Sequence, residues 1–323
     1  MPKQIPKNLR CIYVGNFGPH NTETHLMQAL ERRGHIVEPV QERHGIWNRV
    51  LPDAVSSRPD FVMWTHTGRL DSDYQSQLVA LNALKDFGIP TVGYHLDLFW
   101  GISRELLIGV DPFFNVQILI TPDSDHDDLW RDVGIDHRVL PPATNLADVL
   151  LTGRFTDDRV ADVAFVGSWH RYHPEWGHRQ ELVQRMLQVQ RFRYWPAGGG
   201  EVRGQALADV IASTKILVGD SCWPEGPAGY HSDRIAVTLG HGGFLLHPWS
   251  EQLGEIYKDG VHLRYWPLGD WKELDKLIEY YLAHPREAQK IAAQGRRHVT
   301  NNHTFDERVP EIIRTALSVK ATR

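Results

Sequence analysis

Short, mainly apolar runs alternate with amphipathic stretches along the whole chain. The apolar runs, which end at glycine, proline or polar residues, predict buried strands. They lie at residues 11–14, 35–40, 60–65, 91–94, 116–120, 163–166, 192–195, 215–218 and 244–246. Stretches with helical spacing predict helices at residues 23–33, 73–87, 181–188, 204–213, 232–239, 250–259, 271–283, 285–301 and 306–318. Because strands and helices alternate, we expect an α/β fold of parallel, right-handed, doubly wound sheets.

The alternating pattern divides into two halves. Residues 145–159 are polar and irregular, so we expect a linker there. A chain of 323 residues is long enough for two domains that each bury a core. The sequence therefore predicts an N-terminal domain over residues 1–148 and a C-terminal domain over residues 160–305.

The composition narrows the class of protein. Hydrophobic residues make up 41% of the chain and charged residues 23%, as in globular proteins. The net charge of −5 argues against a protein that coats nucleic acid by charge alone. No secretory signal and no apolar run long enough to span a membrane is evident, and the two cysteines, Cys11 and Cys222, suggest no disulfide framework. We therefore expect a cytoplasmic protein without a membrane span.

Residues 230–260 combine several features in a specific order. Arg234 stands near the start of a predicted helix, and a glycine-rich turn, the run Gly-x-Phe-Leu-Leu and a helix ending in Tyr-x-Asp-Gly follow. Further along come Leu-Ala-His-Pro at residues 282–285 and the motif His-Thr-Phe-x-x-Arg at residues 303–308. Over residues 213–308 this arrangement resembles the C-terminal donor domain of GT-B glycosyltransferases, in particular the family-4-like group related to bacterial spore-maturation glycosyltransferases.

The resemblance implies a fold and an activity. GT-B enzymes have two Rossmann-like domains facing a cleft, and their last helix, here residues 306–323, packs back on the first domain. The C-terminal domain would bind a nucleotide-sugar donor, and the N-terminal domain would bind the acceptor. The donor is a co-substrate, so the resemblance implies no bound cofactor and no metal. It also implies transfer with retention of the anomeric configuration.

Candidate donor-binding residues lie at predicted strand ends and helix starts. A guanidinium such as that of Arg234 can bind a diphosphate and stabilise the charge of the leaving group, although it could equally be a surface arginine. Gly167 would let the backbone approach a phosphate closely. The other candidates are the phosphate-site residues Ser168 and Arg171, with His173 and Arg179 nearby, the base-side residues Trp195 and Gly198, and the helix-start donors Tyr230 and Ser232. A plain turn explains residues 195–199 as well, and a serine at a helix start is often only an N-cap.

Two positions depart from the pattern of the related enzymes. Those enzymes carry glutamates where this chain has Gly229 and Val237, and the second of these glutamates binds the ribose of the donor. Glu225 and Asp233 keep the same mutual spacing one helical turn earlier and could substitute. The nucleobase and the sugar of the donor therefore stay open.

The N-terminal half offers candidates for acceptor chemistry. Asp97 stands at the end of a predicted strand and could act as a base toward the acceptor hydroxyl or hold sugar hydroxyls. His20 and His66 could share that work, although a lone histidine is as often structural. By resemblance, the loop of Gly15, Asn16, Phe17 and Gly18 borders the acceptor site.

Two Asp-x-Asp triplets, residues 71–73 and 123–125, could be mistaken for a metal site. Both precede predicted helices, so helix capping explains them better. No histidine or cysteine spacing suggests zinc. The sequence therefore predicts a metal-independent enzyme.

The acceptor class stays open at this point. A glycan, a small molecule and a hydroxylated base in DNA are all compatible, and a DNA acceptor would need a basic rim such as Arg43, His44, Trp47 and Arg49 could supply. Two other functions also remain. The chain could be a GT-B relic that binds a nucleotide or glycan without catalysis, or a sugar-nucleotide epimerase.

Overall fold

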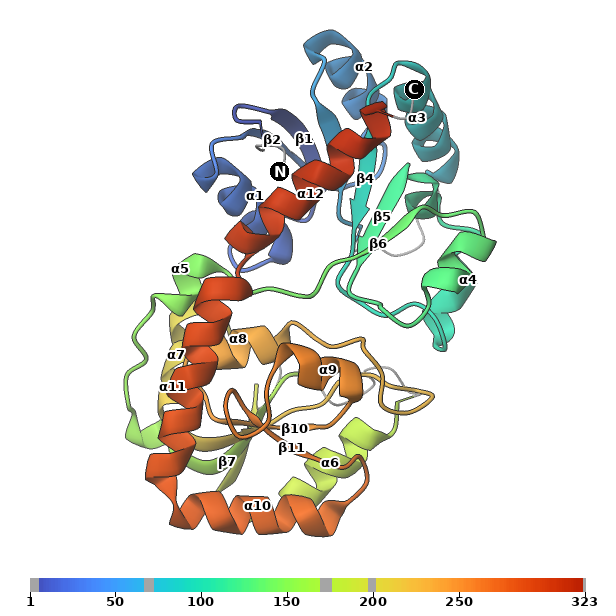
Figure 1. Cartoon of the computed structure of the whole chain (residues 1–323). Helices are drawn as coiled ribbons and strands as arrows, with labels where there is room; N and C mark the ends of the chain where they lie inside the picture. Colours follow the sequence, from blue (N-terminus) through green and yellow to red (C-terminus); the bar gives the residue numbers. More distant parts are fainter. Residues whose placement is uncertain (1–5, 67–72, 169–175, 197–201, 322–323) are drawn as a thin grey trace. The chain divides into compact units, whose positions relative to one another are not determined.

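The computed structural model describes residues 6–66, 73–168, 176–196 and 202–321. The chain forms two compact units (Figure 1). The first comprises Met1–Pro141 together with Phe305–Arg323, and the second comprises Pro142–Thr304. Both are α/β units with one fully parallel sheet, which confirms the predicted fold class.

The first unit is built on six parallel strands in the order β2-β1-β3-β4-β5-β6. The strands are β1 (Arg10–Gly15), β2 (Ile36–Gln41), β3 (Phe61–Trp64), β4 (Thr91–Tyr94), β5 (Ile118–Thr121) and β6 (His137–Val139). The helices are α1 (Thr22–Arg32), α2 (Trp47–Ser57), α3 (Tyr74–Asp86), α4 (Asp127–Asp132) and α12 (Phe305–Ala321), with 3-10 turns η1 (Ser103–Leu107) and η2 (Pro112–Asn115).

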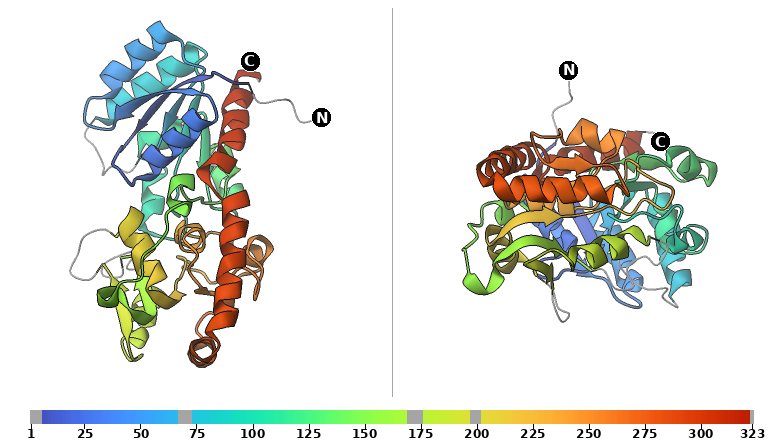
Figure 2. Two further views of the ribbon diagram at one scale, coloured as in Figure 1. Left: turned by 90° about the vertical axis from the view of Figure 1, so that its left-hand side faces the viewer. Right: turned by 90° about the horizontal axis from the view of Figure 1, so that it is seen from below.

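Helices cover both faces of this first sheet. Helices α2 and α3 lie side by side over one face, and α1 and α12 pack together over the other (Figures 1 and 2). Right-handed crossovers dictate this arrangement, because the chain moves one way from β1 to β2 and the other way from β2 to β3. The core between α2, α3 and the sheet is rich in aromatic side chains, among them Trp47, Trp64 and Phe113.

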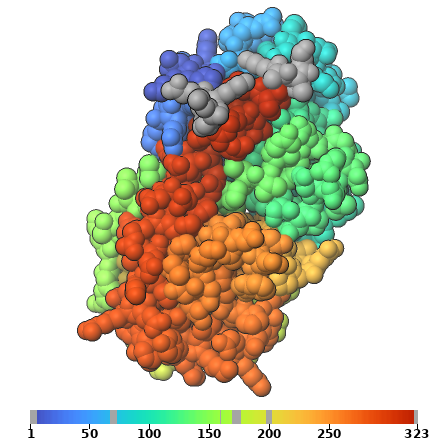
Figure 3. All heavy atoms as spheres, in the orientation of Figure 1, coloured from blue at the N-terminus to red at the C-terminus, as the bar shows by residue number. Residues whose placement is uncertain are grey.

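A paired set of charges holds α12 to the first unit. Arg32 donates two hydrogen bonds to the Asp306 carboxylate, from Nε at 2.9 Å and from Nη2 at 2.7 Å. Arg308 Nε donates to the carbonyl of Pro141 at 2.7 Å. In Figure 3 α12, in dark red, runs across the visible face of this unit.

The second unit has five parallel strands in the order β11-β10-β9-β7-β8. The strands are β7 (Ala161–Val166), β8 (Phe192–Trp195), β9 (Thr214–Val218), β10 (Leu245–Pro248) and β11 (Arg264–Trp266). The helices are α5 (Leu146–Val149), α6 (His178–Met186), α7 (Gly204–Ala212), α8 (Arg234–Gly240), α9 (Glu251–Ile256), α10 (Trp271–Ala283) and α11 (Pro285–Asn302), with the 3-10 turn η3 (Asp157–Arg159).

The structure differs from the expected elements in several places, since α2, α4, β6 and β11 lie outside the predicted ranges. Helix α2 was not expected, because Pro52 lies inside it and proline disfavours helix interiors. Its residues Trp47, Val50 and Ala54 are nevertheless buried at helical spacing, so tertiary packing outweighs the proline. Residues 145–159 are not a free linker either, because α5 begins there and packs against α7, α8 and α11 within the second unit.

No helix in the described parts of the chain is both long and apolar enough to cross a lipid bilayer.

Candidate functional site

The guanidinium of Arg234 lies directly against Gly167 in the second unit. A Cβ added at Gly167 would lie 2.7 Å from Nη2 of Arg234 and 2.9 Å from its Cζ. Gly167 also has a φ of +142°, a region that side-chain-bearing residues rarely adopt. A side chain at this position would therefore displace the guanidinium and strain the turn after β7.

Asp220 anchors this arginine together with a second one. The Asp220 carboxylate, which is 1% exposed, accepts hydrogen bonds from Nε of Arg179 at 2.9 Å and from Nε1 of Trp176 at 2.8 Å. Nη1 of Arg234 lies 3.6 Å from the same carboxylate. Asp220 follows β9, and Gly167 follows the neighbouring β7, so these groups meet at the carboxyl edge of the sheet, where α/β folds bind ligands.

This cluster carries a net positive charge. Burial alone raises the pKa of Asp220, but the adjacent Arg179 and Arg234 outweigh burial and hold that pKa below its ordinary value. One ionised carboxylate therefore faces two guanidinium groups. Nη1 of Arg179 is also bonded to the carbonyl of Ser168 at 3.2 Å, whereas the Arg234 side chain remains 19% exposed. Arg234 is thus the cation of the pair that an anion can reach.

The segment before α8 is tightly packed. The helix begins at Arg234, two residues later than expected, and the hydroxyl of Ser232 accepts a hydrogen bond from the backbone N–H of Arg234 at 3.2 Å. Tyr230 is buried, and its carbonyl accepts from Nε1 of Trp223 at 2.6 Å. Ser232 therefore supports the backbone before Arg234, and Tyr230 belongs to the packed interior.

Trp195 lies beside the same turn. It ends β8, and its carbonyl accepts from the N–H of Gly167 at 2.8 Å. Its indole Nε1 has no hydrogen-bond acceptor among the described residues. Arg171, His173 and Gly198 lie outside the described residues. The structure thus brings Gly167, Trp195 and Arg234 to one edge of the sheet.

No carboxylate occupies the two positions where related enzymes carry glutamates. Gly229 is buried and Val237 is half-buried on α8. Of the candidate replacements, Glu225 is exposed, and Asp233 accepts a hydrogen bond from the hydroxyl of Ser232 at 3.2 Å. Asp233 is thus held one residue before Arg234, and it stays a candidate for the ribose contact.

In the first unit, the loop after β1 closes over a buried glutamate. Glu23 in the first turn of α1 accepts from the N–H of Asn16 at 3.2 Å, and burial raises its pKa. A Cβ at Gly15 would lie 2.7 Å from Cγ of Glu23. Phe17 is tied to Gln41 through its N–H, and the carbonyl of Gly18 accepts from the hydroxyl of Thr24. His20, at the end of this loop, is exposed.

Asp97 and His95 follow β4 on the same sheet. Asp97 forms an ion pair with Arg104, and both side chains are about one-third exposed. The N–H of Asp97 donates to Nδ1 of His95 at 3.0 Å, and burial lowers the pKa of His95 to about 4. His95 is therefore neutral at pH 7, with its proton on Nε2. Its position at a strand end was the only sequence signal for it.

His66 has the opposite electrostatic environment. Its Nδ1 lies 2.5 Å from Oε1 of Glu42, and its Nε2 lies 3.3 Å from Oδ2 of Asp111. Burial alone lowers the pKa of His66, but the two carboxylates outweigh burial and raise it to about 9. A histidine that is protonated at neutral pH cannot accept a proton. His66 therefore acts as a buried cation here, and Asp97 is the better candidate for a base.

Among the described residues of the two Asp-x-Asp triplets, neither Asp73 nor Asp123 accepts a capping hydrogen bond from a helix N–H. Asp73 stands before α3, but its carboxylate accepts from the N–H of Gly45 and the hydroxyl of Ser76. Asp123 is buried and accepts from the N–H of Asp125 and from His126, which precedes α4. The rest of the first triplet, residues 71 and 72, lies outside the described residues. Within the described residues no group of three or more His, Cys, Asp or Glu side chains could hold a metal ion.

Trp47, the aromatic residue of the candidate DNA-binding rim, is buried. Trp47 is 1% exposed and packs against Trp64, with ring centroids 4.7 Å apart. It therefore cannot stack on a base at the surface.

A comparison with family models matches most of the second unit and the start of α12. Residues 156–314 match the model of a family described as glycosyl transferase-like. The match thus marks this part of the chain as glycosyltransferase-like. The description of this family agrees with the predicted enzyme class, so the prediction of a glycosyltransferase is confirmed. No curated protein matches the sequence.

Solved structures similar to this one are GT-B glycosyltransferases. Anabaena HepE in complex with UDP-glucose has a TM-score of 0.62 at 13% identity, over 96% of this chain and 100% of that one. An alpha-glucosyltransferase in complex with UDP-glucose and DNA containing an abasic site has a TM-score of 0.62 at 10% identity, over 95% and 100%. Sucrose-phosphate synthase from Thermosynechococcus elongatus has a TM-score of 0.59 at 12% identity, over 96% and 100%. At such identities the likeness shows the GT-B fold, and the narrower spore-maturation group stays a prediction.

Proposed function

We propose that this glycosyltransferase transfers a sugar, most simply glucose, from its UDP conjugate to an acceptor hydroxyl. The observation that carries the proposal is the Arg234 guanidinium, which rests on Gly167 and is anchored by Asp220 at the carboxyl edge of the second sheet. Structures with the same fold contain UDP-glucose, which supports this choice of donor.

In this proposal Arg234 binds the diphosphate of the donor. A guanidinium can contact two phosphate oxygens at once, and it stabilises the negative charge that builds up on the leaving diphosphate. The nearby Arg179 adds a second positive charge, so that a metal ion need not supply it. Trp195 and Gly167 lie at the same edge, and they would contact the nucleoside and the phosphates.

The acceptor side of the reaction is assigned to the first unit. Asp97 would hold a hydroxyl by accepting a hydrogen bond from it, and the neutral His95 would donate a hydrogen bond from Nε2. Retention of configuration follows if the leaving phosphate takes the proton of the acceptor on the face that it leaves. The anomeric configuration of the product, read from its proton NMR spectrum, tests this part.

The donor assignment is tested first by binding. We expect UDP to raise the melting temperature more than GDP, ADP, TDP or CMP, because a ligand that binds only the folded state stabilises it by mass action. Arg234→Ala should abolish the shift. Arg286→Ala, an exposed arginine on α11, should retain it. Equal shifts in Arg234→Ala and the unmodified protein would contradict the proposed phosphate site.

Turnover then separates an enzyme from a binding protein. The proposal expects release of UDP from UDP-glucose to accelerate when a suitable hydroxylated acceptor is added. UDP binding without any turnover, across acceptors of every class considered, would favour a non-catalytic nucleotide-binding protein. Interconversion of UDP-sugars without an acceptor would favour an epimerase.

A further inference from the structure

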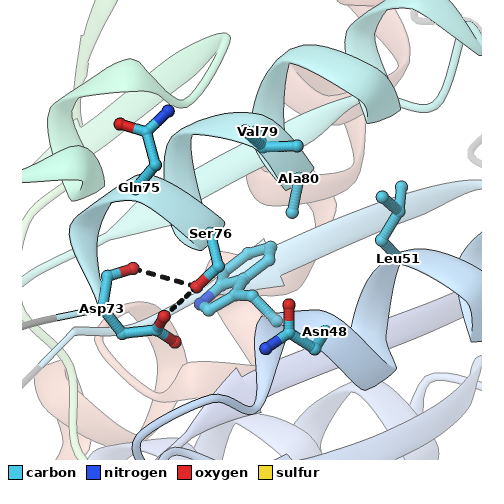
Figure 4. A pocket seen from close by; sticks show the side chains of 8 residues that line it. Asn48, Leu51, Asp73, Gln75, Ser76, Val79 and Ala80 are labelled. Atoms are coloured by element: carbon cyan, nitrogen blue, oxygen red, sulfur yellow. Dashed lines mark hydrogen bonds between the residues drawn. The ribbon is translucent and has the colours of Figure 1, made fainter.

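The first unit contains a pocket of about 470 Å³ between helices α2 and α3 (Figure 4). Such a volume lies within the usual range for small-molecule sites. The residues that line it are Trp47, Asn48, Leu51, Asp73, Gln75, Ser76, Val79 and Ala80. None of them belongs to the donor site.

One end of the pocket is formed by the starts of two helices. Trp47 and Asn48 begin α2, and Asp73 immediately precedes α3, so this end of the pocket lies near the carboxyl ends of the strands. The N–H of Gly45 donates to the Asp73 carboxylate at 2.8 Å, which ties the loop before α2 to the start of α3. The two helix starts are therefore held together around the pocket.

Aromatic contacts connect the pocket with His66, the histidine that lies between Glu42 and Asp111. Trp47 contacts Trp64, and Trp64 contacts His66, with ring centroids 4.7 Å and 5.1 Å apart. The indole Nε1 of Trp47 is buried and has no acceptor among the described residues. A ligand oxygen that reached this nitrogen would satisfy a buried donor.

The chemistry of the lining changes along the pocket. Its polar end carries the Asn48, Asp73 and Ser76 side chains from the first turns of the two helices. One turn further along, its apolar end is formed by Leu51, Val79 and Ala80 (Figure 4). No lysine or arginine is among the described residues that line it. A carboxylate without a lining cation disfavours a phosphate group, whereas amide, hydroxyl and carboxylate oxygens all bond to hydroxyls.

We propose that this pocket binds the acceptor, and that the acceptor is an uncharged, hydroxylated small molecule with an apolar part. Its hydroxyls would bond to Asn48, Asp73 and Ser76, and its apolar part would lie against Leu51 and Val79. This inference rests on the proposed glycosyl transfer, because it names the acceptor class. It names a small molecule rather than DNA, because the described lining offers a phosphate one carboxylate and no cation.

The test uses 4-nitrophenyl β-D-glucopyranoside, which has a hydroxylated end and an apolar end, as a probe of the full-length protein. Titration calorimetry should show binding, and hydrogen exchange should show slower exchange of amides in α2 and α3. Methyl β-D-glucopyranoside, without the aryl group, and 4-nitrophenyl phosphate, without the hydroxyls, should both bind more weakly. Absence of probe binding at millimolar concentration would overturn the proposal, as would equally tight binding of 4-nitrophenyl phosphate.

A matched pair of variants locates the site. Val79 on α3 is 53% exposed and Val133, outside the pocket, is 49% exposed, so glutamate can be introduced at either without burying a charge in the core. Val79→Glu should weaken probe binding by about tenfold, because it places a carboxylate at the apolar end. Val133→Glu should leave binding unchanged. Equal affinities in the two variants would overturn the assignment.

A second variant guards against misfolding of the first. Ser76→Ala removes one hydroxyl at the polar end, and it should weaken binding of the glucoside without lowering the melting temperature by more than a few degrees. Binding unaffected by Ser76→Ala and by Val79→Glu would place the probe elsewhere. UDP binding through Arg234 is measured without this probe, so the donor proposal and the pocket proposal can fail separately.

Discussion

At the scale of single residues, the Arg234 side chain limits which residue types fit at position 167. Gly167 must be a glycine because the Arg234 guanidinium occupies the space of its Cβ and because its φ is +142°. The two residues are 67 positions apart (234 − 167) and meet only because β7 and β9 are neighbours in the sheet. A glycine at a strand end is by itself a weak sequence signal for a binding site. The contact with Arg234 gives the physical reason for the glycine at this position.

Gly167→Ala should therefore impair donor binding more than folding. The added methyl group must displace the Arg234 guanidinium. The alanine must also keep a backbone conformation that is unfavourable for it, which costs on the order of 1 kcal/mol or more in stability. We expect UDP affinity, measured by calorimetry, to fall at least about tenfold, equivalent to 1.4 kcal/mol.

Gly177→Ala is the matched control for this substitution. Gly177 has a φ of −69°, and a Cβ there would meet no atom within 4 Å. Its UDP affinity should equal that of the unmodified protein. An unchanged affinity in Gly167→Ala would mean that Arg234 does not bind the donor from its observed position.

At the scale of elements, capping explains where several helices begin. Ser250 accepts from the N–H of Leu253 at the start of α9, and Asp270 accepts from the N–H of Glu273 at the start of α10. Serine and aspartate are both common N-cap residues, so these helix starts can be recognised in the sequence. Helix α2 lacks such a cap, and its side chains enter the core instead.

Asp270→Ala should shorten or destabilise α10. Removing an N-cap side chain leaves a backbone N–H without its acceptor, at a cost of about 1 kcal/mol. The free energy of unfolding, measured by urea denaturation, should fall by that amount. Asp270→Ser should restore most of it, since serine can accept the same bond. An unchanged free energy of unfolding in Asp270→Ala would show that the cap contributes nothing.

At the scale of the whole molecule, histidines whose pKa values shift in opposite directions make stability depend on pH. Burial lowers the pKa of His95, His247 and His262, each to about 4, whereas Glu42 and Asp111 raise the pKa of His66 to about 9. In the unfolded chain all four return to about 6.5. The folded state thus binds fewer protons than the unfolded one at the first three sites and more at His66.

Stability should therefore decline on both sides of pH 6.5. As the pH falls from 6.5 toward 4, the unfolded state gains protons at His95, His247 and His262, which favours unfolding. As the pH rises from 6.5 to 9, the contribution of His66 is lost, up to about 3 kcal/mol. Urea denaturation at pH 5, 6.5, 8 and 9.5 measures this curve.

His66→Gln isolates the alkaline side of the curve. The variant should be less stable at pH 6.5 and should lose little further stability up to pH 9. His20→Gln, at an exposed loop position, should keep the full pH dependence. An alkaline decline that persists undiminished in His66→Gln would show that another group is responsible.

The sequence by itself determined the local elements and the fold class. Strands such as residues 91–94 and 192–195, and the helix at residues 271–283, have the predicted bounds, because apolar periodicity and capping act within a few residues. Arg234 and Gly167 were also found as candidates from their places at a helix start and a strand end.

The partners of those residues were decided only by the tertiary structure. Asp220 bonds to Arg179, 41 positions away, and Glu42 bonds to His66, 24 positions away. Strand order brings such pairs together, and a strand's neighbours in a parallel sheet cannot be read from its own residues. For the same reason the sequence showed a possible base at His66, whereas the packed structure surrounds that imidazole with two carboxylates and makes it a cation.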